Sequence, residues 1–180
     1  GSQVGIKVIL TMPASVTPER VKLAQSYGAE VILTPAEEGI PGAIEKAKQL
    51  QEQYQAYIPD QFNNPFNVLA HELTTGPEIL KQTDWEVDAF VAGVGSGGTI
   101  SGVGRALRRA LGNRVKIIAV EPAESPVLSG GEAGSHIIQG IGAGFIPTVF
   151  DRDLVDEIIA VTGDEALEGV KMLSAKGYSV

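Results

Sequence analysis

The chain has 180 residues, of which 43% are hydrophobic, and this is enough for a core of ordinary size. Its net charge of −8 argues against nucleic-acid backbones and anionic membranes as main partners, and no apolar run approaches the ~20 residues that cross a bilayer. Without cysteine it can form neither disulfides nor thiolate metal sites, and its two histidines, His71 and His136, lack ligand spacing, so we expect a soluble, cytoplasmic protein with no metal site.

The first third of the chain alternates predicted strands and helices. Apolar and β-branched residues favour strands at 7–12 and 31–34. A helix is expected over 18–27, with Thr17 as its N-cap, and amphipathic spacing predicts another helix over 40–54. Short loops between alternating strands and helices imply a parallel sheet with right-handed crossovers.

A segment rich in proline and asparagine, 58–67, is the expected boundary between two domains. It separates 4–57, interpreted as part of a smaller N-terminal βα domain, from 68–180, interpreted as a larger domain that binds a cofactor phosphate. A helix is expected over 68–81, and the pair Gly76-Pro77 should kink or restart it.

The chain is organised around a predicted buried strand at 87–94 that runs into a glycine-rich loop and then a helix from about Thr99. The helix carries apolar residues on one face and should end at Gly112. The glycines of the loop allow a tight turn that aims several unpaired backbone N–H groups, together with the positive end of the helix, at one small volume. We therefore expect this loop to hold a phosphate.

The same loop matches the dinucleotide-binding fingerprint, as Gly93-x-Gly95-x-x-Gly98. Glu121 follows the next predicted strand, roughly 20 residues on, where an acid would bind a ribose. Taken alone, the match is also satisfied by a βα turn whose glycines serve only close packing. An NAD-binding Rossmann module therefore stands as an alternative.

The last third of the chain should add two more strands, at 115–120 and 154–161, and a further helix that begins with a capping box of Thr162 and Glu165. Between the strands lies 137–146, which is apolar but has too many glycines for a stable helix or strand. Its backbone either lines a ligand or forms a tightly packed turn under the core.

Four motifs occur in order along the chain: QFNNP from Gln61, TTGPEI from Thr74, GVGSGGTISG from Gly93, and EPAESPVL from Glu121 followed by QGIGAGFIP from Gln139. Together they resemble cysteine synthase, the O-acetylserine sulfhydrylase of the fold-type II pyridoxal-phosphate enzymes, over nearly the whole chain. The resemblance implies an α/β fold, doubly wound, with mainly parallel sheets of the tryptophan synthase β-like type, here incomplete. Cystathionine β-synthase shares a GSGGT-like loop and is the nearest alternative, but QGIGAGFIP and SPVLSGG favour cysteine synthase.

The resemblance also implies a cofactor, a reaction and site residues. Pyridoxal 5'-phosphate would be held through its phosphate by the loop residues Gly95, Ser96, Gly97, Gly98 and Thr99. Gln61 would lie near the substrate carboxylate, and Gly140 beside the substrate amine. The enzyme would be a transferase of cysteine biosynthesis that replaces the acetate of O-acetylserine with sulfide, and a homodimer and serine acetyltransferase are its candidate partners.

The chain departs from the family pattern in its catalytic residues. The family lysine that forms the Schiff base, in an S-x-K-D-R-like motif, and the T-S-G-N-T-G substrate loop are both missing, and the serine that bonds the pyridine nitrogen would lie beyond Val180. A strand predicted from Tyr178 also stops at the chain end. The chain therefore resembles a truncated middle segment that keeps the phosphate loop, has no catalytic residue, and is expected to be inactive alone. A non-catalytic scaffold, in which the loop survives only as part of the fold, is a third alternative.

Overall fold

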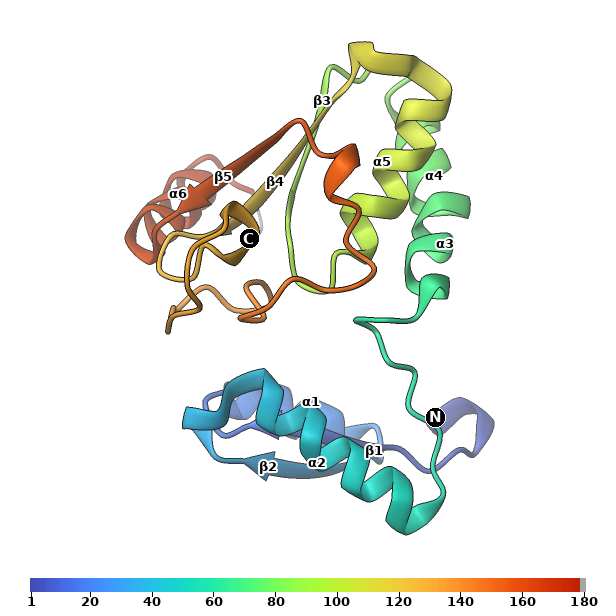
Figure 1. Cartoon of the computed structure of the whole chain (residues 1–180), viewed down its shortest axis with the longest axis vertical. Coiled ribbons are helices and arrows are strands. Elements are labelled where there is room, and N and C mark those ends of the chain that lie inside the picture. The colour runs from blue at the N-terminus through green and yellow to red at the C-terminus, as the bar shows by residue number, and fades with distance from the viewer. Residues whose placement is uncertain (179–180) are drawn as a thin grey trace. The chain divides into compact units, whose positions relative to one another are not determined.

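The computed structural model describes residues 1–178 and divides the chain into two compact units, Gly1–Pro59 and Asp60–Val180 (Figure 1). Each unit contains a parallel sheet, as the alternation of strands and helices predicted. Of the strand expected at 178–180, Ser179 and Val180 lie outside the described residues. None of the helices within residues 1–178 combines the length and the hydropathy that a membrane span requires.

The first unit is a two-stranded sheet with two helices. Its elements are β1 (Ile9–Pro13), α1 (Pro18–Ser26), β2 (Glu30–Thr34) and α2 (Gly39–Tyr54), with short 3-10 helices at Ser2–Val4 and Ala36–Glu38. The strands pair in parallel with Ile9 opposite Glu30. Helix α2 packs on β1, where Thr11 Oγ1 donates a hydrogen bond of 2.8 Å to the carbonyl of the buried Ala43. The strands and helices predicted here are confirmed to within two residues at their ends.

The second unit is a three-stranded parallel sheet in the order β3-β4-β5. Its elements are α3 (Pro65–Leu73), α4 (Thr75–Gln82), β3 (Ala89–Gly93), α5 (Gly98–Leu111), β4 (Lys116–Pro122), β5 (Glu157–Val161) and α6 (Gly163–Ala175), with 3-10 helices at Gly112–Arg114, Val127–Ser129 and Arg152–Leu154. Helices α3, α4 and α5 pack against one another (Figure 1). The central strand β4 places Lys116 opposite Ala89 of β3, and Ile118 opposite Glu157 of β5.

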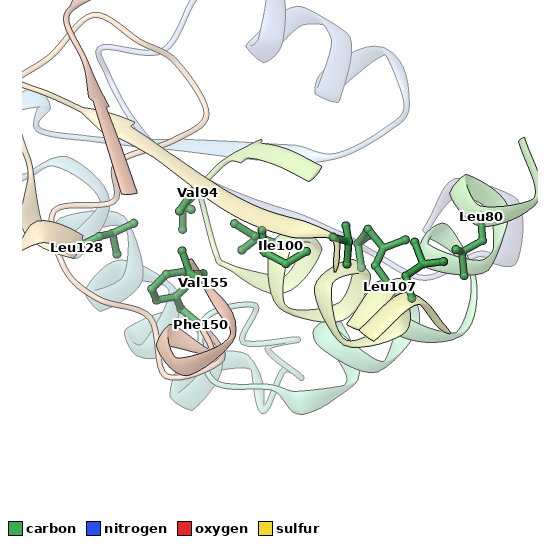
Figure 2. Close-up of a cluster of buried hydrophobic side chains, with 12 residues drawn as sticks. Leu80, Val94, Ile100, Leu107, Leu128, Phe150 and Val155 are labelled. Atoms are coloured by element: carbon green, nitrogen blue, oxygen red, sulfur yellow. The ribbon is translucent and has the colours of Figure 1, made fainter. Parts of the chain in front are cut away.

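Helix α5 lies in the centre of this unit. The apolar face predicted from its spacing is buried, and Ile100, Val103 and Leu107 are each no more than 1% exposed. Their side chains belong to one cluster that also includes Val94 and Phe150 (Figure 2). Because Val94 comes directly after β3, this packing fixes where the strand ends relative to the start of α5.

The helix expected over 68–81 is two helices, which confirms the restart predicted for the Gly-Pro pair. The break lies at Thr74, whose backbone leaves the helical region with φ −121° and ψ −72°. Pro77 then falls within the first turn of α4, where no backbone donor is needed. Gly76 permits close packing on α5, since a Cβ there would lie 2.4 Å from Ala106 Cβ.

The strand expected at 154–161 starts only at Glu157, so its predicted beginning was wrong. Arg152–Leu154 instead forms a 3-10 turn. Asp156, directly before the strand, accepts hydrogen bonds from the Ile117 backbone N–H (2.7 Å) and from Arg108 (2.5 Å). This carboxylate holds the entry to β5 against β4 and α5, an interaction that strand propensity alone does not reveal.

Candidate functional site

The connection between β3 and α5 is a tight turn that requires glycine at two positions. Gly97, the N-cap of α5, has φ +85°, and a Cβ there would lie 2.8 Å from Phe150 Cβ and 3.0 Å from Phe150 Cα. A Cβ on Gly95 would lie 2.7 Å from the carbonyl oxygen of Gly140. The turn is therefore packed against Phe150 on one side and against Gly140, in the glycine-rich segment 137–146, on the other.

A cavity of about 290 Å³ opens at the N-terminus of α5. It is lined by Gln61, Gly93, Gly95, Ser96, Gly97, Thr99, Ile100 and Gly140. The structure thus brings six of the seven site residues proposed from the sequence to one cavity, although they come from three separate segments. The seventh, Gly98, is buried at the start of α5, where a Cβ would lie 2.1 Å from Asn67 Oδ1.

The cavity is suited to an anion because backbone N–H groups and hydroxyls at the start of α5 can donate hydrogen bonds to it. The first helical bond of α5 is donated by Ser101 N–H to Gly97 O (3.1 Å), and Gly98 N–H donates a long bond to Ser96 Oγ (3.4 Å). The N–H groups of Thr99 and Ile100 therefore need acceptors outside the helix. The hydroxyls of Ser96 and Thr99 border the same space. Among the described residues that line the cavity there is no lysine or arginine, so a bound phosphate would be stabilised by hydrogen bonds and the helix dipole.

Two residues of α3 contact the loop, and neither was proposed as a site residue from the sequence. Asn67 Nδ2 donates to Ser96 Oγ (2.8 Å) and to the Gln61 carbonyl oxygen (2.8 Å). His71, one turn further along, places Nε2 3.1 Å from Thr99 Oγ1 and Nδ1 2.9 Å from the Thr75 hydroxyl. The spacing of four between Asn67 and His71 puts both on the face of α3 that packs on α5, a signal that helical periodicity could have supplied.

The second glycine-rich segment, 137–146, is neither helix nor strand, as expected. Its three glycines all have positive φ, which are 88° at Gly140, 66° at Gly142 and 83° at Gly144. The packed turn is confirmed at Gly142, and the interpretation that this backbone lines a ligand stays a prediction. Gly140 lines the cavity, whereas Gly142 is packed within the fold: its N–H donates to Val94 O (3.0 Å), and its carbonyl lies 3.0 Å from His136 Nε2.

Glu121, the acid that a dinucleotide site would direct at a ribose, has a structural role. It is 1% exposed, and its carboxylate accepts hydrogen bonds from Leu128 N (2.7 Å), Ser129 N (3.1 Å) and Ser129 Oγ (2.5 Å). These donors all come from the turn after β4, which the carboxylate anchors. The fingerprint match therefore lacks its acidic partner, and the NAD-binding alternative loses its main support.

Comparison with known proteins identifies relatives over the whole chain. The family model of the pyridoxal-phosphate dependent enzymes matches residues 1–180. The cysteine synthases of Staphylococcus aureus strains Mu50 and N315 are 52% identical over 165 residues, which is 91% of this chain and 53% of theirs. The chain thus spans about half the length of the curated relatives that it matches.

Solved structures give the same result for the fold. A cysteine synthase from Entamoeba histolytica superimposes with a TM-score of 0.89 at 41% identity, over 97% of this chain and 52% of that chain. A hydrogen sulfide-producing enzyme from Fusobacterium nucleatum gives 0.93 at 41% identity, over 97% and 59%. These matches confirm the predicted α/β fold with parallel sheets of fold-type II.

Proposed function

The chain belongs to the pyridoxal-phosphate dependent enzymes, and we propose that it forms the phosphate-binding part of a cysteine synthase. The parent reaction would replace the acetate of O-acetylserine with sulfide, giving L-cysteine and acetate. The observation that carries the proposal is the single cavity at the N-terminus of α5, to which the glycine loop, Gln61 and Gly140 all contribute. The 52% identity to curated cysteine synthases supports this activity over the cystathionine β-synthase alternative.

The residues around the cavity fit the phosphate of the cofactor. A Cβ on Gly95 or Gly97 would collide with Gly140 or Phe150, so glycine at both positions lets the loop pack against the segments beside it. We propose that Ser96, Thr99 and the N–H groups of the first turn of α5 donate to the phosphate oxygens, and that the helix dipole offsets the charge. Gly98 would contribute through its backbone, whose N–H donates to Ser96 Oγ (3.4 Å).

The substrate would be oriented by the other two residues of the cavity. We propose that the side-chain amide of Gln61 donates to the substrate carboxylate, and that the backbone beside Gly140 accepts from the substrate amine. When bound, the cofactor supplies the electron sink that β-replacement requires. The residues of the cavity would bind the cofactor phosphate and orient the substrate, whereas the proton transfers need another group.

We further propose that these 180 residues do not complete a turnover alone. None of the eight lysines lines the cavity, and neither histidine does, so no side chain at this site is suited to hold the cofactor covalently or move a substrate proton. On the same family grounds we propose a cytoplasmic location, a homodimer, and serine acetyltransferase as a partner. Residues 4–57 and 68–180 would be parts of the smaller and larger domains, joined by 58–67.

Ligands without an aldehyde test the phosphate site without lysine adducts. Pyridoxine 5'-phosphate and inorganic phosphate should each raise the melting temperature, whereas pyridoxine should not. At 100 times the dissociation constant the stabilisation should be about 2.7 kcal/mol. An equal response to pyridoxine, or no response to either phosphate, would contradict the proposal, and a response to NAD alone would favour the Rossmann alternative.

A separate assay tests the absence of turnover. The chain is incubated with pyridoxal phosphate, O-acetylserine and sulfide, and cysteine is measured against the free cofactor. We expect no cysteine above that background. Sulfide-dependent cysteine formation, with one dominant lysine labelled after borohydride reduction, would show that one of the eight lysines acts as the catalytic base and would overturn the proposal.

A further inference from the structure

Asn67 joins two segments of the candidate site without lining the cavity itself. It is the third residue of α3 and is partly buried. Its Nδ2 donates one hydrogen bond to Gln61 O and another to Ser96 Oγ, both at 2.8 Å. One amide group therefore links the backbone of a proposed substrate-binding residue to the hydroxyl of a proposed phosphate-binding residue.

The chemistry of these partners fixes the direction of both bonds. The Gln61 carbonyl oxygen can only accept, so the amide nitrogen of Asn67 must face it, and the second N–H then points to Ser96. Ser96 Oγ accepts this bond and a longer one from the Gly98 N–H (3.4 Å), so its single hydroxyl hydrogen is left to donate elsewhere. Ser96 borders the cavity, and a hydroxyl that already accepts a hydrogen bond is a stronger donor toward an anion.

The space for Asn67 exists only because residue 98 is glycine. A Cβ on Gly98 would lie 2.1 Å from Asn67 Oδ1, 2.4 Å from Cγ and 2.7 Å from Nδ2. Gly98 is itself buried and does not line the cavity. Because Gly98 has no side chain, the Asn67 amide can lie close to the loop.

We infer that Asn67 is a positioning residue, which turns the Ser96 hydroxyl hydrogen toward the bound phosphate and holds Gln61 in register with the phosphate loop. The inference rests on the proposed function, since it assumes that the cavity binds phosphate. It goes beyond that proposal because Asn67 does not line the cavity and acts through Ser96.

A double-mutant cycle on phosphate affinity tests the inference. The variants are Asn67→Ala, Ser96→Ala and the double variant, titrated with inorganic phosphate and with pyridoxine 5'-phosphate by calorimetry. Each single variant should weaken binding about tenfold, the size expected for losing an oriented bond to a charged group. The double variant should bind within about twofold of Ser96→Ala, because Asn67 has no Ser96 hydroxyl left to orient.

Asn113→Ala is the matched control, since it removes an exposed asparagine at the opposite end of α5 and should leave the affinity unchanged. Additive losses in the cycle, or phosphate binding by Asn67→Ala within twofold of the parent, would overturn the inference even if unfolding shows lower stability. If Asn67→Ala does not fold, the cycle is run with the near-isosteric and uncharged Asn67→Leu, whose loss of phosphate affinity must likewise vanish in the Ser96→Ala background. Failure of the parent itself to bind phosphate would instead overturn the proposed function.

Discussion

Replacing Gly97 with alanine should destabilise the Asp60–Val180 unit by about 2–5 kcal/mol. The first part is conformational, because φ at Gly97 is +85° and a left-handed backbone costs an L-residue about 1–2 kcal/mol. The second part is steric. The new Cβ would lie 2.8, 3.0 and 3.3 Å from Cβ, Cα and N of Phe150, atoms that cannot rotate away, and such overpacking costs about 1–3 kcal/mol.

Gly130→Ala separates the two parts. Gly130 follows the turn at 127–129 and has a left-handed backbone with φ +88° and ψ 12°, close to the φ +85° and ψ −6° of Gly97, but a Cβ there meets nothing within 4 Å. It should therefore show only the conformational loss of about 1–2 kcal/mol. The difference between the two variants measures the contact with Phe150.

Urea unfolding can be followed through Trp85, because it is the one tryptophan of the sequence and belongs to the second unit. Gly97→Ala should also lose the stabilisation by inorganic phosphate, whereas Gly130→Ala, which lies outside the cavity lining, should keep it. If the two variants unfold within about 0.5 kcal/mol of each other, or Gly97→Ala still responds to phosphate like the parent, the reasoning about the loop is refuted.

Three further predictions concern the C-terminal part of the chain. Gly169→Ala, in α6 with open space around it, should raise the free energy of unfolding by about 0.5–1 kcal/mol, and a lower melting temperature would contradict this. Thr162→Ala removes the observed capping box and should cost about 1 kcal/mol in the same unfolding assay; no loss would mean that α6 does not depend on its cap. The Ile117 N–H and then Arg108 hold the pKa of Asp156 below its ordinary value, so its stabilisation is fully present above the unfolded-state pKa and is lost as pH falls through the lower folded-state pKa. Asp156→Asn should cost about 1–3 kcal/mol at pH 7 and should flatten this part of the acid unfolding profile, and an unchanged profile would refute the assignment.

The local rules of the sequence were sufficient to predict most elements of secondary structure. The capping box of Thr162 and Glu165 is present, and Gly112 ends α5 with a positive φ. These features involve hydrogen bonds and backbone conformations within a few residues, so the sequence states them directly. The glycine loop after β3 also follows from local pattern, and it predicted an anion site before any fold was known.

The sequence alone was less able to predict which segments come together at the site. Gln61 and Gly140 were proposed only through resemblance to a family, and no periodicity relates them to the loop at 95–99. They line one cavity because β3 and α5, together with the segments before α3 and after β4, converge at one end of the second unit. The roles of Gln61 and Gly140 in substrate binding stay predictions.

The tertiary structure alone decided the roles of Glu121, Asn67 and His71. Glu121 matched a ribose-binding position in the sequence, but it is buried and held by the turn at 127–129. Asn67 and His71 contact the loop across 29 and 28 residues of chain, because the packing of α3 on α5 brings them there. Local periodicity specifies which face of a helix is apolar, but the partner of each polar side chain depends on which helices pack together, and that choice is made by the whole core.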